Sequence, residues 1–313
     1  MQTAKTLDVL AIGEAMVEFN QQSAQHYLAG YGGDTSNCAI AAARMGARTG
    51  YLTQLGGDRF GDELVALWRR EGVSTEGVAR LAAAPTAVYF VHHDERGHHF
   101  TYRRAGSAAS RMGPADLPAG LIERAQWLHC SGISQAISAT ACEAVMAAIA
   151  RARAAGTRVS YDLNFRPSLW PAAQALQVAQ ATLVQCDLFF PSIDEVAALT
   201  GLREPQAVID WSHAQGARMV ALKLGAQGSL LSLGDGRVQR IAPHPVQAQD
   251  ATGAGDCFAG ALLARLAAGD APEQAARAAN VAAALSTLGH GAVAPLPHWP
   301  AVQALLAAAV AKP

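Results

Sequence analysis

Short apolar runs alternate with longer stretches of helical periodicity along most of the chain. The short runs predict buried strands, and an apolar residue at every third or fourth position predicts a helix packed by one face. Their alternation predicts a mostly parallel sheet with helices on both faces. Strands are expected at Val9–Ile12, Thr49–Gln54, Trp127–Cys130, Val159–Asp162, Leu188–Phe190 and Met219–Lys223. Helices are expected at Asn37–Met45, Asp62–Glu71, Thr140–Ala155, Asp194–Leu199, Phe258–Ala268 and Pro272–Leu288.

Residues 87–104 break this alternation, with two β-prone runs on either side of the turn sequence DERG. The pattern predicts a β-hairpin. If the two histidines next to the turn pair, the register puts Tyr89 directly opposite Tyr102. Arg104 then lies on the face of Tyr102, because side chains alternate with a period of two. This face is either a binding surface or a plain cross-strand aromatic pair beside a solvated arginine.

The composition indicates a folded protein without a polyanionic partner. Hydrophobic residues make up 51% of the 313 residues, enough for one large α/β core, and we expect a single domain over residues 1–313. The net charge of −1 and the pI of about 6.8 argue against nucleic acid and against an anionic membrane. No apolar run free of charge reaches the roughly 20 residues of a membrane span, so we expect a cytoplasmic protein. The five cysteines show no C-x-x-C spacing, which argues against a zinc site and against disulfides.

The segment Asp250–Asp256, with the sequence DATGAGD, carries the strongest chemical signal. Its glycines allow successive backbone N–H groups to converge on an anion where a helix begins. A phosphate repels the carboxylate of Asp256, so a carboxylate at this position is expected to have a function. The obvious one is to deprotonate a hydroxyl that attacks the γ-phosphate of ATP. The alternative is that Asp250, Thr252 or Asp256 only caps a helix.

Other nucleotide-binding and hydrolase signatures are missing from the sequence. After Gly253 and Gly255 the third glycine comes two places late for G-x-G-x-x-G, which argues against a dinucleotide-dependent oxidoreductase. No G-x-x-x-x-G-K-[ST] run indicates a Walker A nucleotide site, and no G-x-S-x-G run indicates a serine hydrolase.

Arg166 and Lys223 lie at the carboxyl ends of predicted strands, where open α/β sheets bind ligands. Together with Arg104, Arg166 could direct two guanidinium groups at a substrate carboxylate. The alternatives for Arg166 are a salt bridge to Asp162 and a contact with a nucleotide phosphate. Lys223, one of three lysines, opens the glycine-bearing loop KLGAQG, either as a phosphate or substrate ligand or as a partly buried structural lysine.

These motifs resemble those of the PfkB, or ribokinase-like, family of sugar kinases, whose closing signature is D-T-x-G-A-G-D. Ala251 departs from that signature by one hydroxyl group. Further segments similar to the family are Gly32–Asn37, Ser131–Ser134, Asp162–Trp170 and 279–292. The middle segments are most similar to 2-keto-3-deoxygluconate kinases, and the absence of the G-G-K-G-A-N run of ribokinase argues against a neutral pentose.

The resemblance implies a ribokinase-like α/β fold, in which a mostly parallel sheet is flanked by helices on both faces. A small β-sheet lid would be inserted from about residues 15–34 and 85–108, and two copies could pair through it. The implied activity is an ATP- and Mg²⁺-dependent phosphorylation of the terminal hydroxyl of 2-keto-3-deoxygluconate. A fructokinase-like or other sugar specificity, and a non-catalytic sugar-binding regulator on the same fold, stay open as alternatives.

The resemblance also assigns roles to residues. The catalytic residues are Asp256 as the base and the backbone of Gly253, Ala254 and Gly255. The substrate-binding residues are Gly33, Asp34, Asn37, Tyr89, Tyr102, Arg104, Arg166 and Asp256. The nucleotide-binding residues are Asn164, Lys223, Gly225, Gly228, Gly253, Gly255 and Asn280. Glu195 is expected to order Mg²⁺ through water, as the glutamate of an N-x-x-E element in which Ser192 replaces the asparagine. An exposed helix position is the alternative for Glu195.

Overall fold

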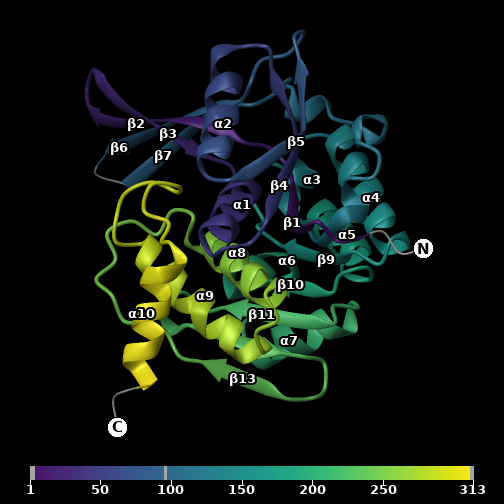
Figure 1. Ribbon diagram of the computed structural model, residues 1–313, viewed down its shortest axis with the longest axis vertical. Helices are drawn as coiled ribbons and strands as arrows, with labels where there is room; N and C mark the ends of the chain where they lie inside the picture. Colours follow the sequence, from purple (N-terminus) through teal and green to yellow (C-terminus); the bar gives the residue numbers. More distant parts are fainter. Residues whose placement is uncertain (1–3, 95–96, 311–313) are drawn as a thin grey trace.

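The computed structural model describes residues 4–94 and 97–310 (Figure 1). Within these residues, nine strands form one large sheet in the order β13-β12-β11-β10-β9-β8-β1-β4-β5. Neighbouring strands are parallel from β11 to β5, and β12 and β13 join antiparallel at one edge. The strands are β1 Leu7–Ile12, β4 Thr49–Gly56, β5 Val73–Leu81, β8 Ala125–Ser131, β9 Arg158–Asp162, β10 Leu188–Phe190, β11 Met219–Lys223, β12 Ser229–Ser232 and β13 Val238–Ile241.

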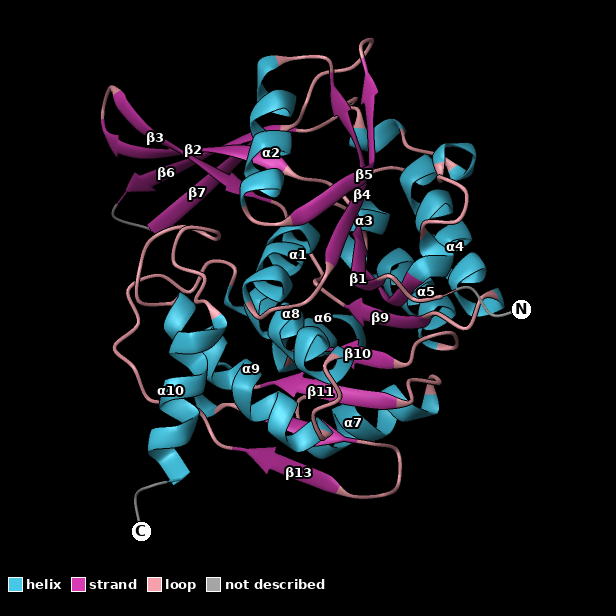
Figure 2. Ribbon diagram, in the orientation of Figure 1, coloured by secondary structure: helices cyan, strands magenta, loops and turns pink. Residues whose placement is uncertain are grey.

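Helices cover both faces of this sheet (Figure 2). They are α1 Asp34–Arg44, α2 Arg59–Arg70, α3 Gly132–Ala136, α4 Ala139–Ala154, α5 Ala172–Leu183, α6 Ile193–Thr200, α7 Pro205–Ala214, α8 Ala254–Ala267, α9 Pro272–Ser286 and α10 Trp299–Val310. Alternate residues of β1 enter separate cores, because Val9 and Ala11 cluster with α1, α8 and α9 while Leu10 and Ile12 cluster with α4 and α5. Among the described helices, none combines the length and the apolar character needed to cross a bilayer.

A second, small sheet projects from one side of the core (Figures 1 and 2). Its strands are β3 His26–Gly32, β2 Met16–Ser23, β6 Val88–Asp94 and β7 Gly97–Arg103, in that spatial order. The β6–β7 register pairs Tyr89 with Tyr102, as the alternation predicted. The turn residues 95–96 of the predicted hairpin lie outside the described residues.

All the predicted core strands and helices are present, but one helix start matters for the chemistry. The prediction began the helix after the DATGAGD segment at Phe258, whereas α8 begins at Ala254. Gly253 alone makes the turn, at φ 76°, so Ala254 and Gly255 are already helical. A side chain at Gly253 would also crowd Ala292, at about 3.0 Å from its Cβ. Asp256 therefore lies in the first turn of α8 rather than in a loop.

Candidate active site

A cavity of about 1190 Å³ lies between the small sheet and the carboxyl ends of the core strands. This is where open α/β sheets place ligands. Most of the predicted site residues line it, namely Gly33, Asp34, Asn37, Tyr89, Tyr102, Arg104, Asn164, Arg166, Glu195, Lys223, Gly225, Gly253, Gly255 and Asp256. Ala254, Gly228 and Asn280 are not among its lining residues.

The start of α8 offers free backbone donors to the cavity. The amide of Ala254 donates to the Ala251 carbonyl at 3.2 Å, whereas those of Gly255 and Asp256 lack an acceptor in the described part of the chain. Asp250 braces the loop before them, since its Oδ1 accepts from the Thr252 amide and its Oδ2 from the Gly291 amide, both at 2.9 Å. The positive end of the helix dipole thus faces the cavity with two unused amides, an arrangement suited to an anion.

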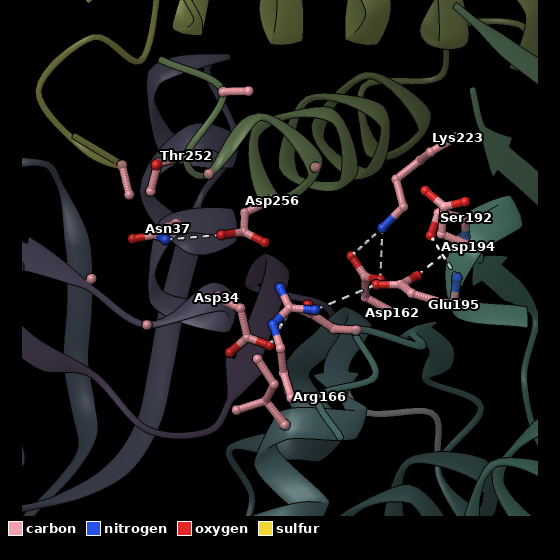
Figure 3. Close-up of a pocket in the computed structure, with 18 of the residues that line it drawn as sticks. Asp34, Asn37, Asp162, Arg166, Ser192, Asp194, Glu195, Lys223, Thr252 and Asp256 are labelled. Carbon is pink, nitrogen blue, oxygen red and sulfur yellow. Dashed lines mark hydrogen bonds and ion pairs between the residues drawn. The ribbon is translucent and has the colours of Figure 1, made fainter. Parts of the chain in front are cut away.

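The carboxylate of Asp256 turns away from the helix end and toward α1 (Figure 3). Its Oδ2 accepts a hydrogen bond from Asn37 Nδ2 at 2.8 Å. The residue that caps α8 is Gly253, with no side-chain bond, so the alternative that Asp256 only caps this helix is wrong. Burial raises the pKa of the Asp256 carboxyl well above its usual range, and the charges of Asp34 and Asp162 add to the shift. A raised pKa makes this carboxylate a stronger base than an ordinary aspartate.

Four charged side chains form a network at the ends of β9 and β11 (Figure 3). Lys223 Nζ donates to both carboxylate oxygens of Asp162, at 2.7 and 2.8 Å. Arg166 is not the partner of Asp162, since its Nη1 lies instead 3.7 Å from Glu195 Oε1. Burial raises the pKa values of Asp162 and Glu195. Burial opposes the charge of Lys223, but Asp162 and Glu195 outweigh it and raise the pKa of that ammonium group. Lys223 is thus a partly buried lysine that also lines the cavity, so the two interpretations of this residue do not exclude each other.

Glu195 has a structural task besides facing the cavity. Its Oε2 accepts from the Ser192 amide at 3.1 Å, and its own amide donates to Ser192 Oγ at 3.4 Å, which makes a capping box at the start of α6. The side chain is only 15% exposed, so the alternative of an exposed helix position is wrong. The capping box also gives a physical reason for a serine at position 192.

At the start of α1, the carboxylate of Asp34 is also held in place. Its Oδ1 accepts from the Thr35 amide at 2.8 Å and its Oδ2 from Asn164 Nδ2 at 2.9 Å. Asn164 has φ 37° and is the one non-glycine residue in the described chain with a positive φ. Such conformations cost free energy and persist where surrounding contacts demand them. Asn164, predicted as a nucleotide contact, thus bonds directly to a residue predicted to bind the sugar.

The small sheet supplies two aromatic rings and an arginine to the same cavity. The rings of Tyr89 and Tyr102 stack with centroids 5.7 Å apart, and the Arg104 guanidinium lies 5.5 Å from the Tyr102 centroid. Tyr89 is buried, and its hydroxyl donates to Glu18 Oε2. The Arg104 side chain is only 12% exposed and pairs with Glu14, so the alternative of a solvated arginine is wrong.

The remaining predicted nucleotide contacts lie farther along the chain. Gly225 opens a short 3-10 turn after β11 and lines the cavity. Asn280 in α9 donates to the carbonyls of Ile241 and Ala242 and accepts from Ser229 Oγ. These bonds tie α9 to the β12–β13 edge, so a nucleotide contact by Asn280 stays a prediction.

Comparisons with known proteins agree with the fold and the cavity. The sequence pattern of the pfkB family of carbohydrate kinases matches residues 6–299. The chain belongs to this family.

Relatives of this pfkB kinase include enzymes that act on different sugars. It is 33% identical to 2-dehydro-3-deoxygluconokinase from Dickeya dadantii (strain 3937), over 95% of this chain and 99% of that protein. It is 32% identical to fructokinase-1 from Oryza sativa subsp. japonica, over 92% and 94% of the two chains. A crystal structure of fructokinase with bound ATP from Xylella fastidiosa superimposes with a TM-score of 0.88 at 27% identity, over 97% of this chain and 99% of that one.

Sequence reasoning missed two carboxylates of this pfkB kinase. Glu14 lines the cavity and pairs with Arg104, and Glu18 accepts the hydroxyl of Tyr89. A usable signal existed for Glu14, which follows the buried strand β1 at its carboxyl end. The alternation of β2 could not reveal Glu18, because an acidic residue in a strand is read as solvent-facing.

Proposed function

We propose that this kinase transfers the γ-phosphoryl group of ATP to the terminal hydroxyl of 2-keto-3-deoxygluconate, giving the 6-phospho sugar acid. The observation that carries the proposal is a single cavity that Asp256 and the free amides of α8 share with two arginines, Arg104 and Arg166. The similarity to 2-dehydro-3-deoxygluconokinases, named for the same sugar acid, supports the choice of substrate.

In this proposal Asp256 takes the proton of the attacking hydroxyl. Asn37 holds the carboxylate by its Oδ2, which leaves Oδ1 for the sugar. The amides of Gly255 and Asp256 would donate hydrogen bonds that stabilise the negative charge developing on the transferred phosphoryl group. Lys223 supports the same charge, because Gly255 lies beside it, with a Cβ at that glycine 3.6 Å from Lys223 Nζ.

Magnesium fits the oxygen donors of this wall of the cavity. No group of three His, Cys, Asp or Glu side chains in the described residues is arranged as a metal cage. Mg²⁺ needs none in phosphoryl transfer, since it keeps several waters and binds through one or two carboxylates and the substrate phosphates. Glu195 would hold it through water, with Asp162 next to it. Bound there, the ion would neutralise phosphate charge.

The sugar would lie between the core and the small sheet. Arg104 and Arg166 would contact its carboxylate, and Asp34 its hydroxyls, next to Gly33 at the start of α1. The small sheet would act as a lid that excludes water from the reaction. We also propose that two copies pair through this sheet, which exposes large apolar side chains on both faces, Phe100 and Tyr102 on the face of Tyr89 and Tyr27 on the face of Phe90.

A substrate panel tests the function. The measurement is kcat/KM from coupled ADP release with 2-keto-3-deoxygluconate, its galacto epimer and fructose. Fructose has CH₂OH in place of the carboxylate, besides an extra hydroxyl at C3. Without the carboxylate a desolvated guanidinium is left unpaired, so fructose should be at least about 30-fold poorer than the sugar acid. Fructose as the better substrate would establish the fructokinase alternative, which the rice relative favours. Sugar binding without ADP release would indicate a non-catalytic regulator.

A further inference from the structure

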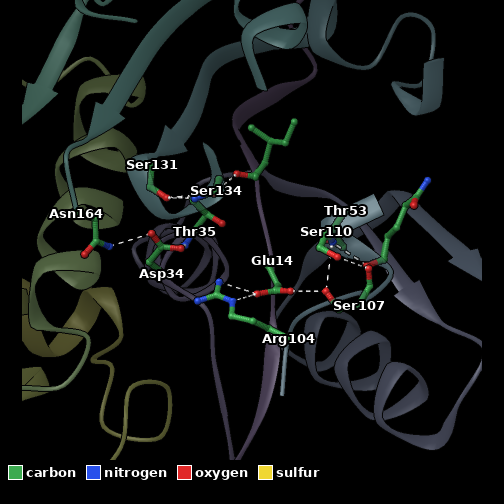
Figure 4. Close-up of polar contacts among 12 residues, drawn as sticks. Glu14, Asp34, Thr35, Thr53, Arg104, Ser107, Ser110, Ser131, Ser134 and Asn164 are labelled. Atoms are coloured by element: carbon green, nitrogen blue, oxygen red, sulfur yellow. Dashed lines mark hydrogen bonds and ion pairs between the residues drawn. The ribbon is translucent and has the colours of Figure 1, made fainter. Parts of the chain in front are cut away.

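Glu14 is a buried residue at the junction between the core and the small sheet. It follows β1 on the connection to β2 and is only 2% exposed. Figure 4 shows its carboxylate between Arg104 and Ser107, which follow β7 on the return to the core. Oε2 lies 2.8 Å from Arg104 Nε and 2.6 Å from Nη2, and Oε1 accepts from Ser107 Oγ at 2.6 Å.

A third connection reaches the same point. Gly33 carries the chain from β3 into α1 at φ 113°, and a Cβ there would collide with the Glu14 carbonyl oxygen. Three of the crossings between the core and the small sheet are thus packed around Glu14. A residue at the end of a core strand therefore fixes the position of the Arg104 guanidinium, and the small sheet alone does not.

A second arginine–glutamate pair shows what is unusual about Arg104. Arg44 contacts Glu71 through the same two nitrogens, Nε to Oε2 at 2.8 Å and Nη2 to Oε1 at 3.0 Å. The Nη1 of Arg44 then donates to the Leu296 carbonyl at 2.5 Å, so the protein itself uses that guanidinium. Arg104 differs, because the described chain offers no acceptor to its Nη1, and its buried Nη2 makes no hydrogen bond of good geometry.

Arg104 therefore presents an unused donor to a ligand. Glu14 occupies the side formed by Nε and the buried Nη2, which leaves Nη1 without a partner in the described chain. A guanidinium N–H donates a strong, charge-assisted hydrogen bond to a carboxylate. Arg104 lines the cavity, so the ligand that fits this donor is an anion held in the sugar site.

We infer that Glu14 is a positioning residue for the sugar carboxylate: it fixes Arg104 so that the free end of the guanidinium meets the acid group of the substrate. The inference rests on the proposed function, since it presumes an acidic sugar. Glu14 itself makes no contact with the substrate and acts only through Arg104. Its loss should then change the selection between acidic and neutral sugars, which a purely structural residue would not do.

The test compares kcat/KM for 2-keto-3-deoxygluconate and for fructose in wild type, Glu14→Gln and Glu14→Asp. Glutamine turns an amide toward Arg104, and aspartate keeps the charge but is one methylene too short to reach both partners. Both variants should lower the acid-to-fructose ratio by at least about tenfold, through a higher KM for the acid with little change in kcat or in the KM for ATP. Glu71→Gln is the control, because it breaks a second arginine–glutamate pair that does not line the cavity, and it should lower the melting temperature without changing the ratio.

The outcomes separate the inference from the function on which it rests. A wild-type enzyme that does not prefer the acid would refute the proposed function. A wild type that prefers the acid, with an unchanged ratio in Glu14→Asp, would refute only the role of Glu14. Glu14→Asp decides even if Glu14→Gln does not fold, because it keeps a negative charge in the buried site close to Arg104.

Discussion

On the core side of the cavity, Lys223 and Asp162 pair at 2.7 and 2.8 Å beside Glu195 and Arg166, whereas on the small-sheet side Arg104 and Tyr89 each bind a carboxylate of their own. The core charges are coupled, so the removal of one changes the pKa and pairing of the others. On the small-sheet side, each of the two groups binds a single carboxylate, and Nη1 of Arg104 stays available for a ligand. Substitutions of Asp162 or Lys223 should therefore affect both turnover and stability, whereas those of Arg104 or Tyr102 should mainly affect substrate binding.

The largest effect is expected from Asp256→Asn, which removes the proposed base. Turnover should fall by about two to four orders of magnitude, while sugar and ATP binding persist. Steady-state kinetics and binding calorimetry measure these two quantities. Asp270→Asn, which removes a carboxylate paired with Arg265 beyond the other end of α8, is the control and should keep turnover. Near-normal turnover in Asp256→Asn would refute the assignment of the base.

Lys223→Met tests whether the core charges depend on one another. It leaves Asp162 buried without its partner, so the free energy of unfolding should fall by about 3–5 kcal/mol. Turnover should fall by roughly 100-fold, because a cation next to the phosphoryl group is lost. The double variant with Asp162→Asn should regain stability in chemical denaturation but not turnover. If it stays as unstable as the single variant, the two side chains are not coupled as described.

The two arginines should differ, since the Arg104 side chain is 12% exposed and that of Arg166 49% exposed. Lysine cannot reproduce the planar pair of donors, so both substitutions should reduce the preference for the sugar acid over fructose. Arg104→Lys should reduce it more, from about 30-fold toward parity. Arg103→Lys, at the exposed neighbouring position of β7, should leave the ratio as in wild type. A larger effect of Arg166→Lys would indicate that the substrate carboxylate binds nearer the core than proposed.

The smallest effects concern the two tyrosines, for which the structure predicts different outcomes. Tyr102→Phe should raise the KM for the sugar about fivefold, the effect of one hydrogen bond, with an unchanged melting temperature. Tyr89→Phe should instead cost about 1–3 kcal/mol of stability, because the buried carboxylate of Glu18 loses its donor. Tyr27→Phe is the control, since that ring is exposed to the same 40% as Tyr102 but does not line the cavity. A KM effect at Tyr27 would contradict the placement of the sugar.

Much of the site was open to prediction because its signals are local. The period of two along 87–104, together with the turn between the runs, sets the register that pairs Tyr89 with Tyr102. The glycines of 253–255 and the carboxylate of Asp256 lie within one turn of α8, so their spacing alone indicates an anion site with a base. Short-range geometry of this kind follows from backbone rules and needs no distant partner.

The partners of the charged groups were not predictable in this way. Lys223 could equally have met a phosphate, and its pairing with Asp162 joins residues 61 positions apart. Asp162 was one predicted partner of Arg166, but Arg166 pairs with Glu195. Arg104 was expected to contact solvent or substrate, but it binds Glu14, 90 positions away. Such pairings depend on which strand ends become neighbours, and periodicity carries no information about that.

The alternation of strands and helices, the hairpin and the chemistry of the DATGAGD segment follow from the sequence, since each depends on residues close together in the chain. The partners of the charged side chains follow only from the tertiary structure. The sheet order brings the ends of β1, β9 and β11 to one edge, and burial there requires every carboxylate and cation to find a partner. That requirement, and not any local motif, leaves Arg104 with Nε and Nη2 on Glu14 and Nη1 free for a ligand.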